Sequence, residues 1–219
     1  MGNFWKSTIM HGLMGALGGL LCLVFYLLWT TPQTPIGHTF TNQSIVKLVR
    51  LEGHGSGVYI GDGNYLTANH VIDGLASVDI VTTGGETRKA NIVWASKDYD
   101  IAMVHADSPD TKPAKLNCGV IPVGSEIHAQ GNPMMLDFVT TYGHIAKLPE
   151  TLDHWKSTYI VDMVTVQGMS GGPVLDSNDD IVGITVGVLY MPLGISSSMT
   201  GIGAVVPSSE ICKMLGIAK

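Results

Sequence analysis

The chain has 219 residues, of which 45% are hydrophobic and 14% are charged, and its formal net charge is −6. Its 12 Lys and Arg residues are scattered, so they form no positive surface of the kind that follows a phosphate backbone, and we expect no nucleic-acid partner. The eight His residues form no His-Glu-x-x-His motif and no short His/Cys pairing, which predicts neither a metal site nor a cofactor.

An apolar stretch without charged residues runs from Ile9 to Trp29. As a helix it would rise about 31 Å, which matches a bilayer core of about 30 Å. A cleaved signal peptide would have a shorter apolar region and a small-residue cleavage site, so we favour an uncleaved single-pass anchor. Lys6 precedes the stretch and the next basic residue is Lys47. The positive-inside rule therefore predicts that residues 1–8 are cytoplasmic and that the rest is extracytoplasmic, which means periplasmic in a Gram-negative cell.

The remainder of the chain divides into a linker and a folded domain. Residues 30–43 carry no charge and include Pro32 and Pro35, which predicts a short extended linker. Residues 44–219 would form the domain, and about 180 residues are enough for one large hydrophobic core or two small ones.

The chain has three cysteines, at positions 22, 118 and 212, and no Cys-x-x-Cys spacing. Cys22 falls within the apolar stretch, so only Cys118 and Cys212 could pair in the folded domain. We expect these two to be buried free thiols.

From residue 44 onward, short apolar runs rich in β-branched residues alternate with turns of Gly, Asn, Asp and Pro. Runs at this spacing predict an all-β sandwich or barrel rather than alternating strands and helices. A polar stretch over 107–115 would connect two halves of the domain. A short C-terminal helix is expected over 208–215, between Pro207 and Gly216.

Three residues stand at positions suited to nucleophilic catalysis, in the order His70, Asp100, Ser170. His70 ends an apolar strand, Asp100 opens another, and Ser170 lies in a turn rich in glycine. A serine hydroxyl becomes an effective nucleophile when a neighbouring imidazole takes its proton, and a carboxylate on the other ring nitrogen orients that imidazole. Asp98 precedes the same strand and, two residues away, would share its face. The run Asp-Ile-Ala-Met-Val assigns the role of the orienting carboxylate to Asp100 and leaves Asp98 as an exposed turn residue.

The glycine-rich turn also has a predicted function of its own. The tetrahedral intermediate of acyl transfer carries an oxyanion that needs two N–H donors aimed at one point. Glycines around Ser170 let the backbone turn so that the amides of Gly168 and Ser170 can supply them.

These motifs resemble the trypsin-like peptidases, in particular the bacterial HtrA/Deg branch, over about residues 45–215. The segments that carry the resemblance are 55–58, 65–71, 100–104, 131–133, 141–145, 168–174, 181–184 and 201–207. The resemblance implies a trypsin-like fold of two six-stranded β-barrels, about 44–106 and 116–207, with the catalytic residues in the cleft between them.

The resemblance also assigns roles within that cleft. His70 becomes the general base, Asp100 its orienting carboxylate and Ser170 the nucleophile of a serine endopeptidase that forms an acyl-enzyme with a protein or peptide substrate. The residues expected to border the P1 pocket are uncharged, which favours an apolar P1 side chain; they are Val164, Thr165, Val186, Gly187 and Val188.

Met169 departs from the family pattern, because the HtrA/Deg branch commonly has Asn there and digestive relatives have Asp. Without that Asp, a new N-terminal amine has no partner for a zymogen switch. The sequence also ends without a PDZ domain and shows no long insertion in the first barrel, so a monomer and a homo-oligomer are both open.

Two other functions compete with the peptidase. A catalytically silent protease-fold module could bind a peptide partner at the membrane, and the bulk of Met169 favours it if that side chain distorts the oxyanion turn. An acyl hydrolase would use the same residue types. However, the α/β-hydrolases carry them in the order Ser, acid, His, which is not the order here.

Overall fold

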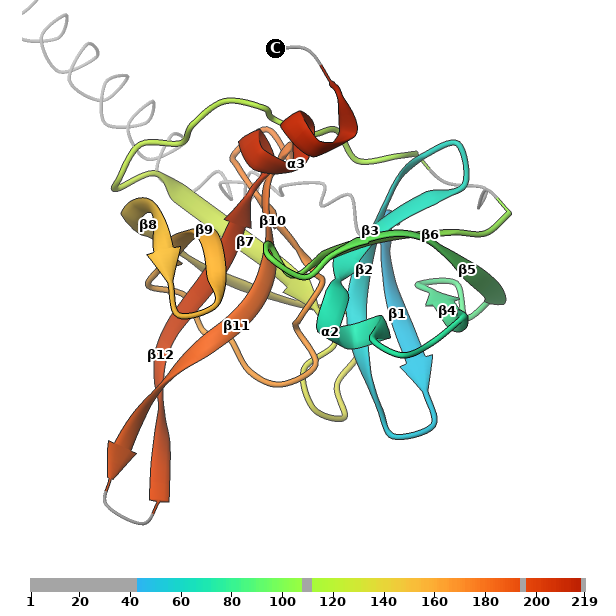
Figure 1. Ribbon diagram of the computed structural model, residues 1–219, viewed down its shortest axis with the longest axis horizontal. Coiled ribbons are helices and arrows are strands. Elements are labelled where there is room, and N and C mark those ends of the chain that lie inside the picture. Colours follow the sequence, from blue (N-terminus) through green and yellow to red (C-terminus); the bar gives the residue numbers. More distant parts are fainter. Residues whose placement is uncertain (1–42, 108–111, 194–195, 218–219) are drawn as a thin grey trace, which may run out of the picture. The chain divides into compact units, whose positions relative to one another are not determined.

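The computed structural model describes residues 43–107, 112–193 and 196–217. They form two closed six-stranded antiparallel barrels and two short helices (Figure 1). The first barrel consists of β1 (Ile45–Arg50), β2 (Gly53–Gly61), β3 (Asn64–Ala68), β4 (Ser77–Thr82), β5 (Thr87–Ser96) and β6 (Ile101–His105). The second consists of β7 (Glu126–Gly131), β8 (Val139–Leu152), β9 (Trp155–Val161), β10 (Pro173–Leu175), β11 (Ile181–Leu193) and β12 (Ser196–Pro207). The predicted all-β double barrel is confirmed.

The first barrel closes in the order β1-β2-β3-β6-β5-β4, and helix α2 (Asn69–Ile72) follows β3 directly. Alternation along β4 places Val78 and Ile80 inside and Asp79, between them, toward solvent, as expected for a sheet with one buried face. The apolar core of this barrel continues into β10, β11, β12 and the C-terminal helix α3 (Ser208–Leu215). The two barrels therefore share an apolar junction.

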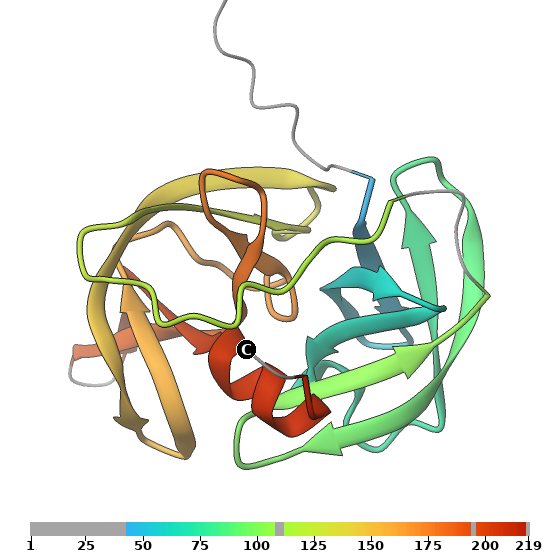
Figure 2. The same cartoon turned by 90° about the horizontal axis from the view of Figure 1, so that it is seen from above.

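The second barrel closes in the order β10-β11-β12-β9-β8-β7 and has a smaller core of its own. Tyr159, Met163 and Met169 are fully buried in it. Figure 2 shows the barrels side by side, with the segment after residue 112 running from the first to the second.

The predicted anchor at 9–29 and the linker at 30–43, apart from Gln43, lie outside the described residues. Within the described ranges, no helix has the length and apolar character needed to cross a membrane.

The connecting segment and α3 meet at Ile181, the first residue of β11. The Ile181 amide donates to Lys115 O at 2.7 Å, and its carbonyl accepts from Asn117 N at 2.8 Å and from Ser208 Oγ at 2.7 Å. These bonds bring the chain around residue 118 against α3.

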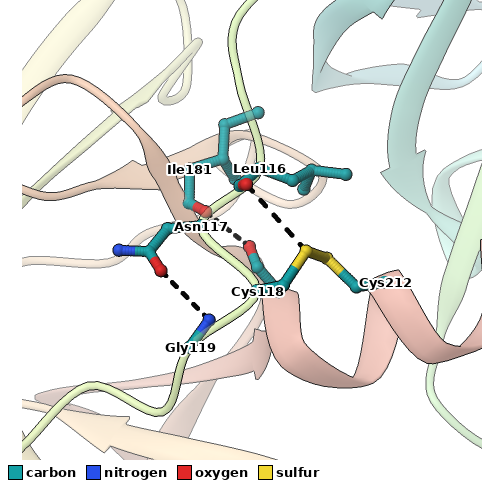
Figure 3. Close-up of a disulfide and its surroundings, with 7 residues drawn as sticks. Leu116, Asn117, Cys118, Gly119, Ile181 and Cys212 are labelled. Atoms are coloured by element: carbon teal, nitrogen blue, oxygen red, sulfur yellow. Dashed lines mark hydrogen bonds between the residues drawn. A yellow bond between two sulfur atoms is a disulfide. The ribbon is translucent and has the colours of Figure 1, made fainter. Parts of the chain in front are cut away.

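Cys118 and Cys212 form a disulfide at this meeting point, with their Cα atoms 5.8 Å apart (Figure 3). The expectation of two free thiols is therefore wrong. The reason is that Ile181 holds both segments in place, which is a long-range arrangement that the spacing of the cysteines does not reveal.

Replacing Cys118 and Cys212 together by Ala should lower the stability of the domain. The cross-linked positions are 94 residues apart, and closing so long a loop in the unfolded chain commonly contributes about 2–4 kcal/mol. For a domain of this size, each kcal/mol corresponds to roughly 2–4 °C in Tm. Calorimetry with and without reductant would measure the loss, with Cys22→Ala as the control that keeps the disulfide. A wild-type Tm that neither reductant nor the double substitution changes would contradict this expectation.

Candidate active site

A cleft of about 620 Å³ is lined by residues of both barrels. The first barrel and its connections contribute Asn69, His70, Lys97 and Asp100. The second contributes His154, Trp155, Thr165, Val166, Gln167, Ser170, Val186, Gly187, Val188 and Tyr190. The three residues singled out by their order in the sequence thus lie in one cleft.

The pairing of β3 with β6 brings His70 and Asp100 together. Ala68 at the end of β3 lies opposite Ile101 at the start of β6, so the residues just beyond this pair are neighbours. The Asn69 amide donates to Asp100 O at 3.0 Å, and the His70 amide donates to Asp100 Oδ1 at 2.8 Å. Two hydrogen bonds donated by backbone amides, one to the carbonyl and one to the carboxylate of Asp100, therefore anchor this residue to the first turn of α2.

The side chains of His70 and Asp100 also interact directly. His70 Nδ1 lies 2.6 Å from Asp100 Oδ2, and because a carboxylate accepts, this nitrogen carries the proton. The Asp100 side chain is 7% exposed and that of His70 47% exposed. The arrangement leaves Nε2 of a neutral His70 as an acceptor.

Asp98 lies in the turn before β6, with a side chain that is 61% exposed and paired with Lys156. Asp100 ends the same turn with a φ of +54°, a left-handed conformation that Asp tolerates better than most residues. The expected shared strand face is therefore wrong, because neither acid has reached the regular strand. The turn directs Asp100 toward His70 and Asp98 toward solvent.

The turn that carries Ser170 requires glycine on both sides. Gly168 and Gly171 have φ values of +97° and +86°. A Cβ atom would lie 2.2 Å from Asn132 O at position 168 and 2.1 Å from Ser56 O at position 171. Only glycine allows the backbone to pack this closely.

Ser56, on β2 of the first barrel, holds this turn from across the junction. Its amide donates to Ser170 O at 2.8 Å, and its hydroxyl donates to Gly168 O at 2.7 Å. The same hydroxyl accepts from the Asn132 amide at 2.9 Å. Within the part of the chain that the structure describes, the N–H groups of Gly168 and Ser170 donate no hydrogen bond to another residue. Such free amides can receive a ligand oxygen.

Met169 is fully buried in the core of the second barrel. Gly131 on β7 leaves room for it, since a Cβ there would lie 3.0 Å from Met169 Cα and 3.1 Å from its Cγ. The side chain thus points into the barrel and away from the cleft, so the bulk of Met169 no longer argues for a distorted turn.

Four of the five residues expected at the P1 pocket line the cleft, namely Thr165, Val186, Gly187 and Val188. Val164 does not, and it is 59% exposed. Its neighbours Met163 and Thr165 are buried, whereas the Val164 side chain faces solvent.

Sequence reasoning missed several residues of the cleft, above all Trp155 at the start of β9. Its indole Nε1 donates to Asp100 Oδ2 at 3.3 Å. No motif marks Trp155, because the contact joins a hairpin of the second barrel to a turn of the first.

Comparison with known proteins shows the protein family to which the chain belongs. A family model described as the trypsin-like peptidase domain matches residues 55–184, which is more than half of the chain. The chain therefore belongs to the trypsin-like peptidase family.

The relatives lie within the Do or HtrA type of this family. The chain is 32% identical over 170 residues to Protease Do-like 1, chloroplastic, of Arabidopsis thaliana, covering 73% of this chain and 38% of that protein. It is 32% identical over 165 residues to the periplasmic pH-dependent serine endoprotease DegQ of Escherichia coli, covering 72% and 35%. The chain thus spans well under half the length of these relatives.

Solved structures agree on the fold. The Rv3671c protease in its inactive form matches with a TM-score of 0.69 at 23% identity, over 80% of this chain and 89% of that one. The HtrA-type protease AlgW with tripeptide matches with a TM-score of 0.70 at 22% identity, over 80% and 60%. At this level of identity the likeness concerns the fold alone.

Replacing Ser56 by Ala should destabilise the domain, because Gly168 O and the Asn132 amide would lose a partner in a buried junction. Leaving such groups unpaired costs about 1–3 kcal/mol. Urea unfolding would measure the loss, and Ser177→Ala, at an exposed turn, should change stability by less than about 0.5 kcal/mol. Equal stabilities of the two variants would show that the Ser56 hydroxyl does not hold the turn.

Proposed function

We propose that this chain is a serine endopeptidase in which His70, Asp100 and Ser170 form the catalytic triad. The observation that carries the proposal is the 2.6 Å contact between His70 Nδ1 and Asp100 Oδ2 in a cleft that Ser170 also lines. A carboxylate at Nδ1 holds the imidazole in the tautomer whose Nε2 can take a proton from a hydroxyl. Family membership supports the same roles.

The reaction would proceed through an acyl-enzyme. Ser170 Oγ attacks the substrate carbonyl carbon while His70 Nε2 accepts the hydroxyl proton. The amides of Gly168 and Ser170 donate to the oxyanion of the tetrahedral intermediate. The protonated imidazole, stabilised by Asp100, gives its proton to the leaving amine. Water, deprotonated by the same imidazole, then releases the acyl group.

The substrate would be a protein or peptide with an apolar P1 side chain. Thr165, Val186, Gly187 and Val188 contribute no charge to the cleft wall, so a basic or acidic P1 side chain would lack a counter-ion there. The solved complex of the HtrA-type protease AlgW with a tripeptide supports a peptide as the ligand class.

The domain would act outside the cytoplasm, next to a membrane. Disulfides persist in oxidising compartments, so the Cys118–Cys212 bond supports this location. The uncharged stretch Ile9–Trp29 supports an anchor, and the relative DegQ is periplasmic by its description.

A fluorophosphonate probe should label the wild-type chain at Ser170, and Ser170→Ala should lose both the label and peptidase activity while it keeps its fold. Triad members act as a unit, so His70→Ala should cost about as much, and the double variant hardly more. Comparing the hydrolysis of casein with the hydrolysis of an ester substrate separates a peptidase from an acyl hydrolase. Peptide binding without labelling would indicate a silent binding module instead.

Asp98 and Asp100, in the turn before β6, allow a matched pair of Asp→Asn variants in the same peptidase assay. Asp100→Asn should lower kcat by a factor on the order of 10⁴, because it favours the wrong tautomer of the imidazole. Asp98→Asn removes only an exposed ion pair and should change the rate little. The reverse pattern would rule out Asp100 as the orienting residue.

External protease added to right-side-out spheroplasts should degrade the catalytic domain while a cytoplasmic marker survives. This outcome is expected because no basic residue follows the apolar stretch before Lys47. Western blotting of the domain would measure it. Protection until the cells are lysed would place the domain in the cytoplasm. A soluble form that begins near Thr30 would indicate a cleaved signal peptide.

A further inference from the structure

The β8–β9 hairpin of the second barrel reaches across the junction to the turn before β6. The amide of Lys156 donates to Asp98 O at 2.9 Å, and the Lys156 ammonium pairs with the Asp98 carboxylate. The hydrogen bond with Asp98 raises the pKa of Lys156, in agreement with this pairing. Trp155, which precedes Lys156, is thereby brought next to Asp100.

The Trp155 ring is also fixed from the side of the cleft wall. A Cβ atom at Gly187 would lie 2.5 Å from Cη2 of the ring, so the indole packs directly on the bare backbone at this position. Any larger residue at position 187 would displace the ring. The backbone hydrogen bond from Lys156 N to Asp98 O on one side and Gly187 on the other thus determine where the indole N–H points.

The indole N–H points at a carboxylate that needs donors. Among the described residues, the Asp100 carboxylate accepts three hydrogen bonds. Two come from the amide and ring of His70, and the third, at 3.3 Å, comes from Trp155 Nε1. A buried ionised carboxylate is costly unless its oxygens are hydrogen-bonded. The His70 amide binds Oδ1, so at Oδ2 Trp155 is, among the described residues, the donor that stays in place whatever the imidazole does.

Within the described part of the cleft, no side chain besides those of His70 and Trp155 donates a hydrogen bond to the Asp100 carboxylate. Val186 and Val188 have no polar hydrogen, and the Lys97 ammonium lies 3.7 Å from Asp73 Oδ1 in a solvent-exposed pair. Trp155 is a donor with no acceptor function, so it can stabilise only the ionised carboxylate or a carbonyl-like oxygen.

We propose that Trp155 is a positioning residue of the active site, whose indole N–H holds the Asp100 carboxylate in the orientation that faces His70 Nδ1. The inference rests on the proposed peptidase function, because the orientation of Asp100 matters for catalysis only if His70 acts as the base. On this proposal, the second barrel helps to orient Asp100 and His70, which belong to the first barrel.

The test is Trp155→Phe, which keeps an aromatic ring against Gly187 and removes the N–H donor. We expect kcat of the full-length chain to fall about 5- to 10-fold while KM stays within about twofold, since only a charge-assisted hydrogen bond is lost. Trp94→Phe, on β5 and packed against the core of the first barrel, is the matched control and should keep the wild-type kcat. A Trp155→Phe variant with wild-type kcat, or with a change in KM alone, would overturn the proposal.

A spectroscopic readout does not depend on activity. The chain has four tryptophans, so a tryptophan-labelled sample gives few indole N–H resonances to assign. In the Ser170→Ala chain, adding Asp100→Asn should move the Trp155 indole N–H resonance upfield, because a neutral amide accepts a weaker hydrogen bond than a carboxylate. The Trp94 resonance should stay in place. An unmoved Trp155 resonance would refute the hydrogen bond between Trp155 and Asp100. A wild-type chain without peptidase activity would instead refute the proposed function. In that case the resonance shift would still show whether Trp155 binds Asp100.

Discussion

The hydrogen bonds from Ser56 to the turn around Ser170 are the interaction on which the cleft depends. One residue of the first barrel binds the carbonyls of Gly168 and Ser170 in the second, and so fixes the backbone of the turn that carries Ser170. The contact is buried, where an unpaired carbonyl would be expensive, so the turn and the junction between the barrels form together. Trp155 provides the opposite connection, from the second barrel to Asp100. Each barrel thus holds a residue that the other contributes to the cleft.

Glycine makes this close approach feasible. At positions 168 and 171 the backbone is left-handed, and a Cβ at either would overlap a carbonyl oxygen. The conformational freedom that these glycines lose on folding is a real cost. The buried core of the second barrel offsets it, and Met169 belongs to that core. The Met169 side chain therefore stabilises the turn from behind, and it does not obstruct the cleft.

A second cross-connection lies on α3. Ile181 binds the connecting segment through Lys115 and Asn117 and binds the start of α3 through Ser208. The disulfide then makes this arrangement covalent. Because the apolar core of the first barrel continues into α3, the link also restrains the junction beneath the cleft.

Several features of this protein follow from the sequence by itself. Apolar runs and turn residues predicted an all-β domain, and the resemblance to the trypsin-like peptidases implied the double barrel, which is confirmed. The order of His70, Asp100 and Ser170 led to three residues that the structure brings into one cleft. These signals are local, since strand periodicity and glycine-rich turns depend on neighbours in the chain. Only the tertiary structure decided that Cys118 and Cys212 pair, that Met169 points into the core, that Val164 faces solvent and that Trp155 reaches Asp100. Trp155 and Asp100 are 55 residues apart and the two cysteines 94, so their contacts depend on how two closed barrels pack against each other. No local pattern in the sequence carries that information.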